Sequence, residues 1–297
     1  MTLSIPIKTW TLAIRPKTLL AGIIPVLVGS FSTELSFSEI HWFVLFSSLL
    51  VAVSLTIAVN LINDALDAKK GKDTHERIGF LRVTQSGLLT ENQVLAAGIG
   101  VLFFTFLFSL PLIIKGGVPI LIMVLLSMLC SYLYTGGPYP ISYNGLGELF
   151  VILFYGFGAV MGAYYLQAGR VNLIALIISL QMGCLATVMI AINNLRDISE
   201  DSKTGKRTLA TRFGVCFGKW EILTLIVTPF LLNIQWLINE RPLAFWLPLC
   251  ALFIGIHLLR GIWQHPPSRI YNRFFGEAAL LMVMFGALLI IGLRAAD

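Results

Sequence analysis

Two clusters of Asp and Asn residues, here called the acidic stripes, each stand near the end of a long apolar segment. The first stripe consists of Asn60, Asn63, Asp64 and Asp67, and the second of Asn193, Asn194, Asp197 and Asp201. Side chains three and four positions apart share one face of a helix, so each stripe is expected to face a cleft. Carboxylates are costly to place in or beside a bilayer, and such clusters usually bind ions or charged substrates, or line a polar cavity. We therefore expect the two stripes to share one cationic centre.

A basic, glycine-containing run follows each stripe. Its cations are Lys72 and Arg77 after the first stripe, and Lys206 and Arg207 after the second. Carboxylate oxygens suit Mg²⁺, which keeps several waters and takes one or two carboxylates together with phosphate oxygens. Carboxylates alone would repel a diphosphate, whereas carboxylates with Mg²⁺ and flanking cations would hold it. The alternative, helix caps beside ordinary topology signals, explains a single Asp better than two matching stripes.

The composition indicates a protein with several membrane-spanning helices. Hydrophobic residues make up 57% of the 297 residues and charged residues only 12%, and the mean hydropathy is +0.85. A span needs about 17 to 25 mostly apolar residues. Apolar segments cover residues 18–33, 43–63, 93–114, 118–135, 147–167, 171–193, 221–239, 243–262 and 274–294. The expected fold is therefore all-α, a polytopic bundle of about nine transmembrane helices.

The stripes also mark a weak internal repeat. An apolar run, an acidic stripe and a basic run recur in this order about 130 residues apart. We expect one integral-membrane domain over residues 1–297, built from two related four-helix modules with a further helix appended. The modules cover roughly residues 15–140 and 145–265, and the ninth helix covers 270–295.

The distribution of basic residues predicts the orientation in the membrane. Of the 21 Lys and Arg residues, 17 fall on one side of the predicted spans. The four on the other side are Lys115, Arg170, Arg241 and Arg294. Because Lys and Arg collect in cytoplasmic loops, the N-terminus and both acidic stripes are expected in the cytoplasm, in an inner or plasma membrane. The net charge of +6 is then a topology signal and a complement to anionic lipid, and no nucleic-acid partner is expected. The Cys and His residues have no metal-site or disulfide spacing, and no obligatory protein partner is indicated.

Four motifs, taken together, resemble those of one known family. They are Arg15-Pro-Lys17-Thr-Leu, the first stripe with Gly71, Asp73 and Arg77-Ile-Gly, Tyr134-Thr-Gly-Gly-Pro-Tyr139-Pro with Gly145-Leu-Gly-Glu148, and the second stripe with Gly205-Lys-Arg-Thr-Leu-Ala210. In this order, over nearly the whole chain, they resemble the UbiA superfamily of intramembrane aromatic prenyltransferases. Within it, the chain is most similar to the 1,4-dihydroxy-2-naphthoate polyprenyltransferases of menaquinone synthesis. The resemblance implies nine helices around a cavity open to the lipid, with Mg²⁺ and a prenyl diphosphate between the two Asp motifs.

Spacing and resemblance together assign roles to these residues. The expected Mg²⁺ ligands are Asp64, Asp67, Asp197 and Asp201, with Asn63 and Asn193 as further catalytic residues. The expected substrate contacts are Asn60, Lys72, Asp73, Arg77, Asn194, Lys206 and Arg207. The metal would stabilise the diphosphate as a leaving group and so allow an allylic carbocation to form. Asp73 fits a solvated loop position equally well, because its offset from the first stripe exceeds a helical turn.

Three tyrosines and two basic residues are candidates for the remaining contacts. Faces of Tyr132, Tyr134 and Tyr139 would stabilise the carbocation by about 0.5 to 2 kcal/mol each, although an interfacial aromatic belt explains any one of them equally well. The acceptor ring would then attack, and the resemblance implies that its carboxylate leaves as CO₂. Arg15 and Lys17 are candidates to anchor that carboxylate, and the alternative for both is simple anchoring of the first span.

Two other functions remain open from the sequence. A cation-coupled transporter also has repeated modules with acids, although its charged site is expected nearer the membrane midplane. A related prenyltransferase acting on homogentisate, 4-hydroxybenzoate or a chlorophyllide-type acceptor would share every Mg²⁺ feature. The loop after the fourth predicted span has no basic residue before Arg170, unlike the 4-hydroxybenzoate branch, and this favours the naphthoate acceptor.

Overall fold

The computed structural model describes residues 7–33, 37–71 and 78–295. Three residues with expected roles, Lys72, Asp73 and Arg77, lie outside this described part of the chain. Every regular element within the described ranges is a helix, which confirms the all-α class expected from the sequence.

Several of the long helices begin at side-chain caps. Thr90, Asn172 and Thr208 each accept a hydrogen bond from a backbone N–H three residues further on, at the starts of three long helices. In chain order the elements are α1 (Ile7–Ile14), α2 (Pro16–Phe31), η1 (Phe37–Glu39), α3 (Trp42–Lys69), α4 (Glu91–Leu133), η2 (Ile141–Asn144), α5 (Gly147–Val151), the π-helix η3 (Ile152–Met161), α6 (Gly162–Ala168), α7 (Leu173–Arg196), α8 (Ile198–Lys203), α9 (Leu209–Leu232), α10 (Ile234–Ile238), α11 (Pro242–Leu249), α12 (Leu252–Gln264) and α13 (Tyr271–Arg294).

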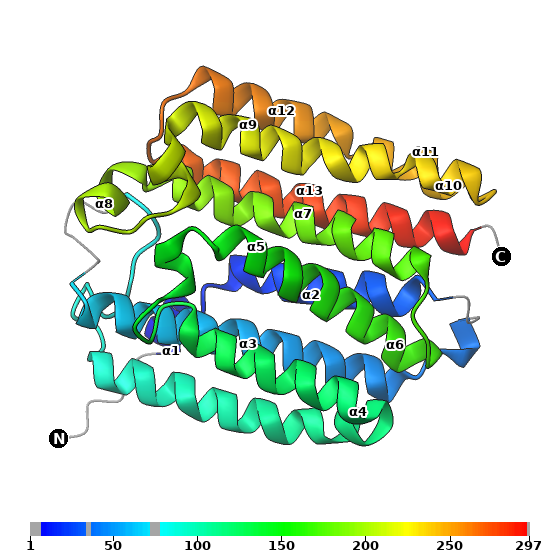
Figure 1. The fold of residues 1–297 in the computed structure, drawn as a ribbon, viewed down its shortest axis with the longest axis horizontal. Coiled ribbons are helices and arrows are strands. Elements are labelled where there is room, and N and C mark those ends of the chain that lie inside the picture. Colours follow the sequence, from blue (N-terminus) through cyan, green and yellow to red (C-terminus); the bar gives the residue numbers. More distant parts are fainter. Residues whose placement is uncertain (1–6, 34–36, 72–77, 296–297) are drawn as a thin grey trace.

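The number of possible spans agrees with the expected count of about nine. Within the described residues, seven helices are long and apolar enough to cross a membrane, and the bent pair of α1 and α2 makes an eighth. The 43-residue helix α4 is broken at Gly117, whose φ of 67° is a left-handed conformation that favours glycine. Figure 1 shows the chain reversing in α4, so this element supplies two antiparallel segments.

A π-helix interrupts the span formed by α5, η3 and α6. Turns of this kind are rare and are frequent at functional sites. Gly156 of η3 lies directly against α7, because a Cβ added to it would come within 2.5 Å of the carbonyl oxygen of Ser179. Small residues at such a contact let two helix backbones approach closely inside a membrane. The span is therefore pressed onto α7, and other residues of the span form part of a cavity.

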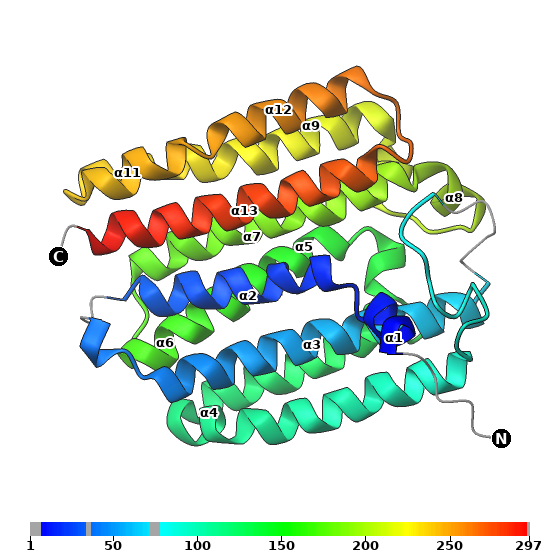
Figure 2. The ribbon, with the colours of Figure 1, turned by 180° about the vertical axis from the view of Figure 1, so that it is seen from behind.

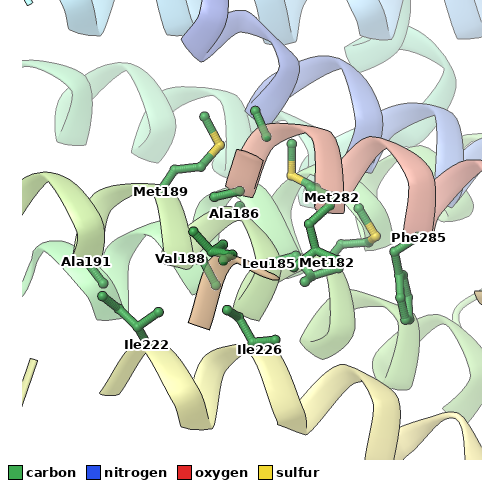
Figure 3. Packing of buried hydrophobic residues seen from close by; sticks show 14 of the residues in the cluster. Met182, Leu185, Ala186, Val188, Met189, Ala191, Ile222, Ile226, Met282 and Phe285 are labelled. Carbon is green, nitrogen blue, oxygen red and sulfur yellow. The ribbon is translucent and has the colours of Figure 1, made fainter. Parts of the chain in front are cut away.

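The central helix of the bundle is α7, which packs against α9, α13 and η3. Lipid tails are as apolar as these side chains, so close van der Waals packing holds this core together inside a membrane. Figure 3 shows side chains of α7 between those of α9 and α13. The labelled residues are Met182, Leu185, Ala186, Val188, Met189 and Ala191 of α7, Ile222 and Ile226 of α9, and Met282 and Phe285 of α13.

Both acidic stripes lie at one end of the bundle. In Figures 1 and 2, α3 and α7 run the length of the molecule and finish at the end where α8 lies. The first stripe occupies the last turns of α3, and the second continues from α7 into α8. The bundle thus brings two distant sequence motifs to the same end of the molecule, whereas the division into two related modules stays a prediction.

Candidate active site

Asp67, in the last turn of α3, is surrounded by hydrogen-bond donors. Its side chain is only 3% exposed. The hydroxyl of Tyr143 donates a hydrogen bond to Oδ1. Oδ2 lies 2.7 Å from Nη2 of Arg82 and 3.2 Å from Nζ of Lys206. Both oxygens of this buried carboxylate are therefore occupied, and two cations compensate its charge.

Lys206 connects the two acidic stripes. Its ammonium lies 3.2 Å from Oδ2 of Asp67 and 4.0 Å from Oδ1 of Asp201 in α8. It also stands 5.2 Å from the centre of the Tyr143 ring. Lys206 and Asp201 are 9% and 8% exposed, so solvent does not separate these charges. One protein cation thus stands between a carboxylate of α3 and a carboxylate of α8.

Two loops hold Tyr143 and Lys206 in place. The backbone N–H of Arg207 donates to the carbonyl oxygen of Tyr143 at 2.9 Å. The guanidinium of Arg212 donates to the carbonyl oxygens of Arg207 and Asn144 at 3.0 and 2.9 Å. The loop around η2 and the loop before α9 are therefore fastened together beside Asp67. The side chain of Arg207 itself is exposed.

Asp64 is directed to a different set of partners. Its carboxylate accepts hydrogen bonds from the backbone N–H groups of Val83 and Thr84 at 3.1 and 3.4 Å, and from the Thr84 hydroxyl. Asp64 is 1% exposed and so anchors the loop between α3 and α4. The expectation that the whole first stripe faces one cleft needs correction, because this loop folds back over the helix end and takes up the Asp64 side chain. Its expected role as a metal ligand stays a prediction.

The carboxylate of Asp197 is bound by the residue that precedes it in the chain. Arg196 donates to both of its carboxylate oxygens, each at 2.7 Å. The guanidinium of Arg196 further donates to Oδ1 of Asn272 at 2.7 Å and lies 5.4 Å from the centre of the Phe80 ring. This arrangement ties the start of α13 and the loop before α4 to the end of α7. Asp197 as a metal ligand likewise stays a prediction.

The two Asn residues of the first stripe have structural partners. Nδ2 of Asn60 donates to the carbonyl oxygen of Ile14 and to Oγ1 of Thr18, both at 2.8 Å, and so fixes the bend between α1 and α2. Oδ1 of Asn63 accepts a hydrogen bond from the hydroxyl of Thr135 at 2.6 Å. Both Asn side chains line the cavity described below.

The two Asn residues of the second stripe differ from each other. Nδ2 of Asn194 donates to Oε1 of Glu148 at 2.6 Å. Asn193 lines the cavity, and its Oδ1 is buried without a hydrogen-bond partner among the described residues. A buried amide oxygen of this kind is costly unless a ligand or water satisfies it. Asn193 is therefore available to a bound substrate or ion.

A mostly apolar cavity of about 260 Å³ begins beside the acidic stripes. Its walls come from α2, α3, the second half of α4, the span containing η3, and α7. Polar lining residues near the stripes are Arg15, Thr18, Asn60, Asn63, Tyr134 and Asn193, and apolar ones include Val26, Val51, Leu55, Leu112, Ile120, Val124, Phe154 and Leu166. The cavity can hold an apolar chain with its charged end toward Asp67.

The expected aromatic contacts divide into one cavity residue and two surface residues. Tyr134 lines the cavity, and so does Tyr155, whose hydroxyl lies 3.3 Å from Oγ1 of Thr56. Tyr132 and Tyr139 are 41% and 82% exposed and do not line it. The geometry therefore brings Tyr134 to the candidate site and leaves the other two expected tyrosines at the surface.

Arg15 and Lys17 also occupy different environments. Arg15 lines the cavity, and its left-handed backbone (φ 56°, ψ 70°) places it at the bend before α2. This conformation is uncommon for a residue other than glycine and often marks a functional position. Lys17 is exposed, with its ammonium 5.7 Å from the centre of the Phe80 ring.

Four site residues were missed by the sequence analysis. Arg82 was counted only as a topology signal, and Tyr143, Glu148 and Tyr155 were assigned no role. Tyr143 and Glu148 lie in or beside the motif between residues 134 and 148, so their position in that motif was an available signal. No local pattern identifies Arg82, because the loop that returns it to Asp67 is a feature of the tertiary structure.

Comparison with known proteins gives consistent matches. The model of the "UbiA prenyltransferase family" matches residues 22–291. A 1,4-dihydroxy-2-naphthoate octaprenyltransferase of Mycobacterium leprae is 35% identical over 226 residues, covering 76% of each chain. One of the same name from Escherichia coli is 37% identical over 215 residues, covering 70% of this chain and 69% of that one.

Solved structures agree on the fold. A UbiA homolog from Archaeoglobus fulgidus bound to GPP and Mg²⁺ has a TM-score of 0.69 at 15% sequence identity, covering 95% of this chain and 99% of that chain. At this identity the likeness concerns the fold alone. It supports the same all-helical architecture for the protein described here.

Proposed function

Because the chain belongs to the UbiA prenyltransferase family, we propose that it transfers a polyprenyl group from a polyprenyl diphosphate to 1,4-dihydroxy-2-naphthoate. The immediate product would be the prenylated naphthalenediol demethylmenaquinol, and its later oxidation would give the demethylmenaquinone of menaquinone biosynthesis. The observation that carries the proposal is the Asp67, Lys206 and Asp201 cluster, together with the apolar cavity that Asn63 and Asn193 of the same stripes line. The relatives named for this acceptor supply its identity.

We propose Mg²⁺ as the cofactor, and the donor set fits it. Asp67 and Asp201 come from two different helices and already enclose one cation, the ammonium of Lys206. Oxygen donors of this kind, completed by water and phosphate oxygens, are what Mg²⁺ prefers. When bound, Mg²⁺ would withdraw charge from the diphosphate and make it a better leaving group. Within the described residues no three Asp, Glu, His or Cys side chains form a group that could hold a metal ion.

Two protein cations are placed to bind the diphosphate. Arg82 and Lys206 are 6% and 9% exposed, and both lie against Asp67. Ion pairs between such groups and phosphate oxygens are strong, since little water screens them. Lys72 and Arg77 stay predicted contacts outside the described residues. Arg207 stays a predicted contact whose side chain is exposed in this structure.

The cavity would exclude water from the reacting carbon. Its apolar walls would hold the first isoprene units, with the diphosphate directed toward Asp67. The faces of Tyr134 and Tyr155 line the same space and would stabilise positive charge on the prenyl carbon. A carbocation protected in this way would react with the aromatic acceptor rather than with water.

The acceptor carboxylate would be bound by Arg15, the cation that lines the cavity. After the carbon–oxygen bond to the diphosphate has broken, the ring carbon that bears this carboxylate attacks the first prenyl carbon, which then carries the positive charge. The new carbon–carbon bond forms, CO₂ leaves, and its bonding electrons return to the ring. Inorganic diphosphate carries away the electron pair of the broken bond.

The distribution of cations supports a location with this site at the cytoplasmic face. The apolar helices make the chain an integral membrane protein. We propose an inner or plasma membrane, with the acidic stripes facing the cytoplasm where a soluble acceptor and diphosphate products are handled. No nucleic-acid or obligatory protein partner is part of this proposal.

The proposal can be tested with purified protein, a panel of aromatic acceptors and prenyl diphosphates of several lengths. Mass spectrometry should show a prenylated naphthalenediol lacking the carboxylate, formed in equal amount with CO₂, and EDTA should abolish the reaction until Mg²⁺ is restored. A preference for homogentisate or 4-hydroxybenzoate would overturn the acceptor assignment. Full turnover in EDTA would overturn the metal assignment.

A further inference from the structure

We propose that Lys206 is a tethered counter-cation that occupies the place of the metal between Asp67 and Asp201 until a diphosphate arrives. The metal and the diphosphate would then bind as a coupled pair, and each would bind poorly alone. This inference rests on the proposed function, in which these two carboxylates hold Mg²⁺. It goes beyond that function because it predicts that removing the ammonium of Lys206 improves binding of the metal in the absence of diphosphate.

The ammonium of Lys206 stands where a bridging cation would stand. It lies 3.2 Å from Oδ2 of Asp67 and 4.0 Å from Oδ1 of Asp201, with the Tyr143 ring at 5.2 Å. A divalent ion bound by both carboxylates would approach the same oxygens. Two like charges cannot share that space in a buried site, since their repulsion is only weakly screened there.

Lys206, rather than Arg82, is built to move. Arg82 has a second anchor, because its Nη1 donates to the carbonyl oxygen of Asn63 at 3.1 Å. Lys206 carries a point charge on a flexible four-carbon stem, and within the described residues its counter-charge comes from the carboxylates of Asp67 and Asp201. Its backbone is fixed, since its N–H donates to the carbonyl oxygen of Asp201 and its own carbonyl accepts from Thr211. Only the side chain needs to rearrange.

A displaced ammonium needs a new anion. Lys206 is 9% exposed, so moving it off the carboxylates without a replacement partner would leave a buried charge unpaired. A diphosphate bound beside the metal offers that partner. Metal binding and diphosphate binding therefore assist each other, and thermodynamic linkage makes the assistance equal in both directions.

Binding of Mn²⁺, followed by electron paramagnetic resonance on the purified full chain, tests this directly. Lys206→Met should bind Mn²⁺ alone about tenfold or more tightly than the wild type, because the competing cation is gone. Lys69→Met is the matched control, since it removes an exposed positive charge from the end of α3 that carries Asp67, and its Mn²⁺ affinity should stay within twofold. Lys206→Gln, with thermal unfolding of all variants, provides a second substitution should the first fail to fold.

A non-cleavable thiodiphosphate analogue of the prenyl donor gives the second readout. It should raise the Mn²⁺ affinity of the wild type about tenfold or more and that of Lys206→Met by much less. The counter-cation role of Lys206 is overturned if the analogue raises the Mn²⁺ affinity of both proteins equally. It is also overturned if Lys206→Met binds Mn²⁺ alone no better than the wild type. Absence of Mn²⁺ binding in every protein with the analogue present overturns the metal assignment as well. Neither readout uses the aromatic acceptor, so an error in the proposed acceptor leaves both valid.

Discussion

Replacing Tyr143 by Phe removes a single hydroxyl from the candidate site. That hydroxyl donates to Oδ1 of Asp67, while the ring lies 5.1 Å from the ammonium of Lys70 and 5.2 Å from that of Lys206. The substitution keeps the ring and both of its cation contacts. A hydrogen bond to a charged group is worth about 1.5 to 3 kcal/mol. Since about 1.4 kcal/mol is a factor of ten in rate, kcat/KM should fall about 10- to 100-fold if the bond positions Asp67 for its role.

The measurement is initial rate of prenyl transfer at varied Mg²⁺ and prenyl diphosphate, with thermal unfolding to confirm that the protein is folded. A positioning role predicts that Tyr143→Phe needs more Mg²⁺ for half-maximal activity. Tyr139→Phe makes the same chemical change four residues earlier in the same loop, on a side chain that is 82% exposed, and it should leave the rate unchanged. A folded Tyr143→Phe protein with kcat/KM within twofold of the wild type would refute the reasoning.

Three further substitutions test other parts of the site. Asp64→Ala should lower the free energy of unfolding, because the backbone N–H of Val83 loses its hydrogen-bond acceptor. The expected loss is about 1 to 3 kcal/mol for each buried donor left without a partner. An unchanged denaturant midpoint would contradict the anchoring role of Asp64. Gly158→Leu should slow transfer of long prenyl chains more than transfer of dimethylallyl, because the leucine side chain would fill part of the cavity. The position tolerates a side chain, since the nearest atom to an added Cβ is 3.5 Å away. Equal slowing of both donors would show that the prenyl chain binds elsewhere. Arg15→Gln should reduce kcat/KM for the naphthoate about 10- to 100-fold with an unchanged KM for the diphosphate. Lys17→Gln should have a small effect, because Lys17 does not line the cavity. Equal effects of the two substitutions on naphthoate kinetics would indicate that both residues only anchor the first span in the membrane.

The break in α4 and the bend between α1 and α2 are features that the local sequence can predict. Apolar segments at 93–114 and 118–135 predict two spans, and the structure divides α4 at Gly117 between them. The segment at 18–33 is short for a span, and the structure extends it with α1 across a 53° bend. Such features follow from composition and from the special conformations of Gly and Pro, which act within a few residues.

The acidic stripes show where local reasoning stops. Helical periodicity places Asp64 and Asp67 on one face, yet Asp64 accepts hydrogen bonds from a returning loop while Asp67 meets Lys206. Periodicity specifies the direction in which a side chain leaves its helix. It does not specify which distant loop meets that side chain.

The sequence by itself determined the membrane class, the helical content and the presence of an acidic and basic centre, because hydropathy and charge are properties of composition and spacing. Only the tertiary structure decided that Asp67 and Asp201 enclose one cation and that Tyr143 and Arg82 join them. These contacts depend on three loops that meet at one end of the bundle, the loop between α3 and α4, the loop around η2 and the loop before α9. Their geometry arises from packing between segments far apart in the chain, where no local pattern acts.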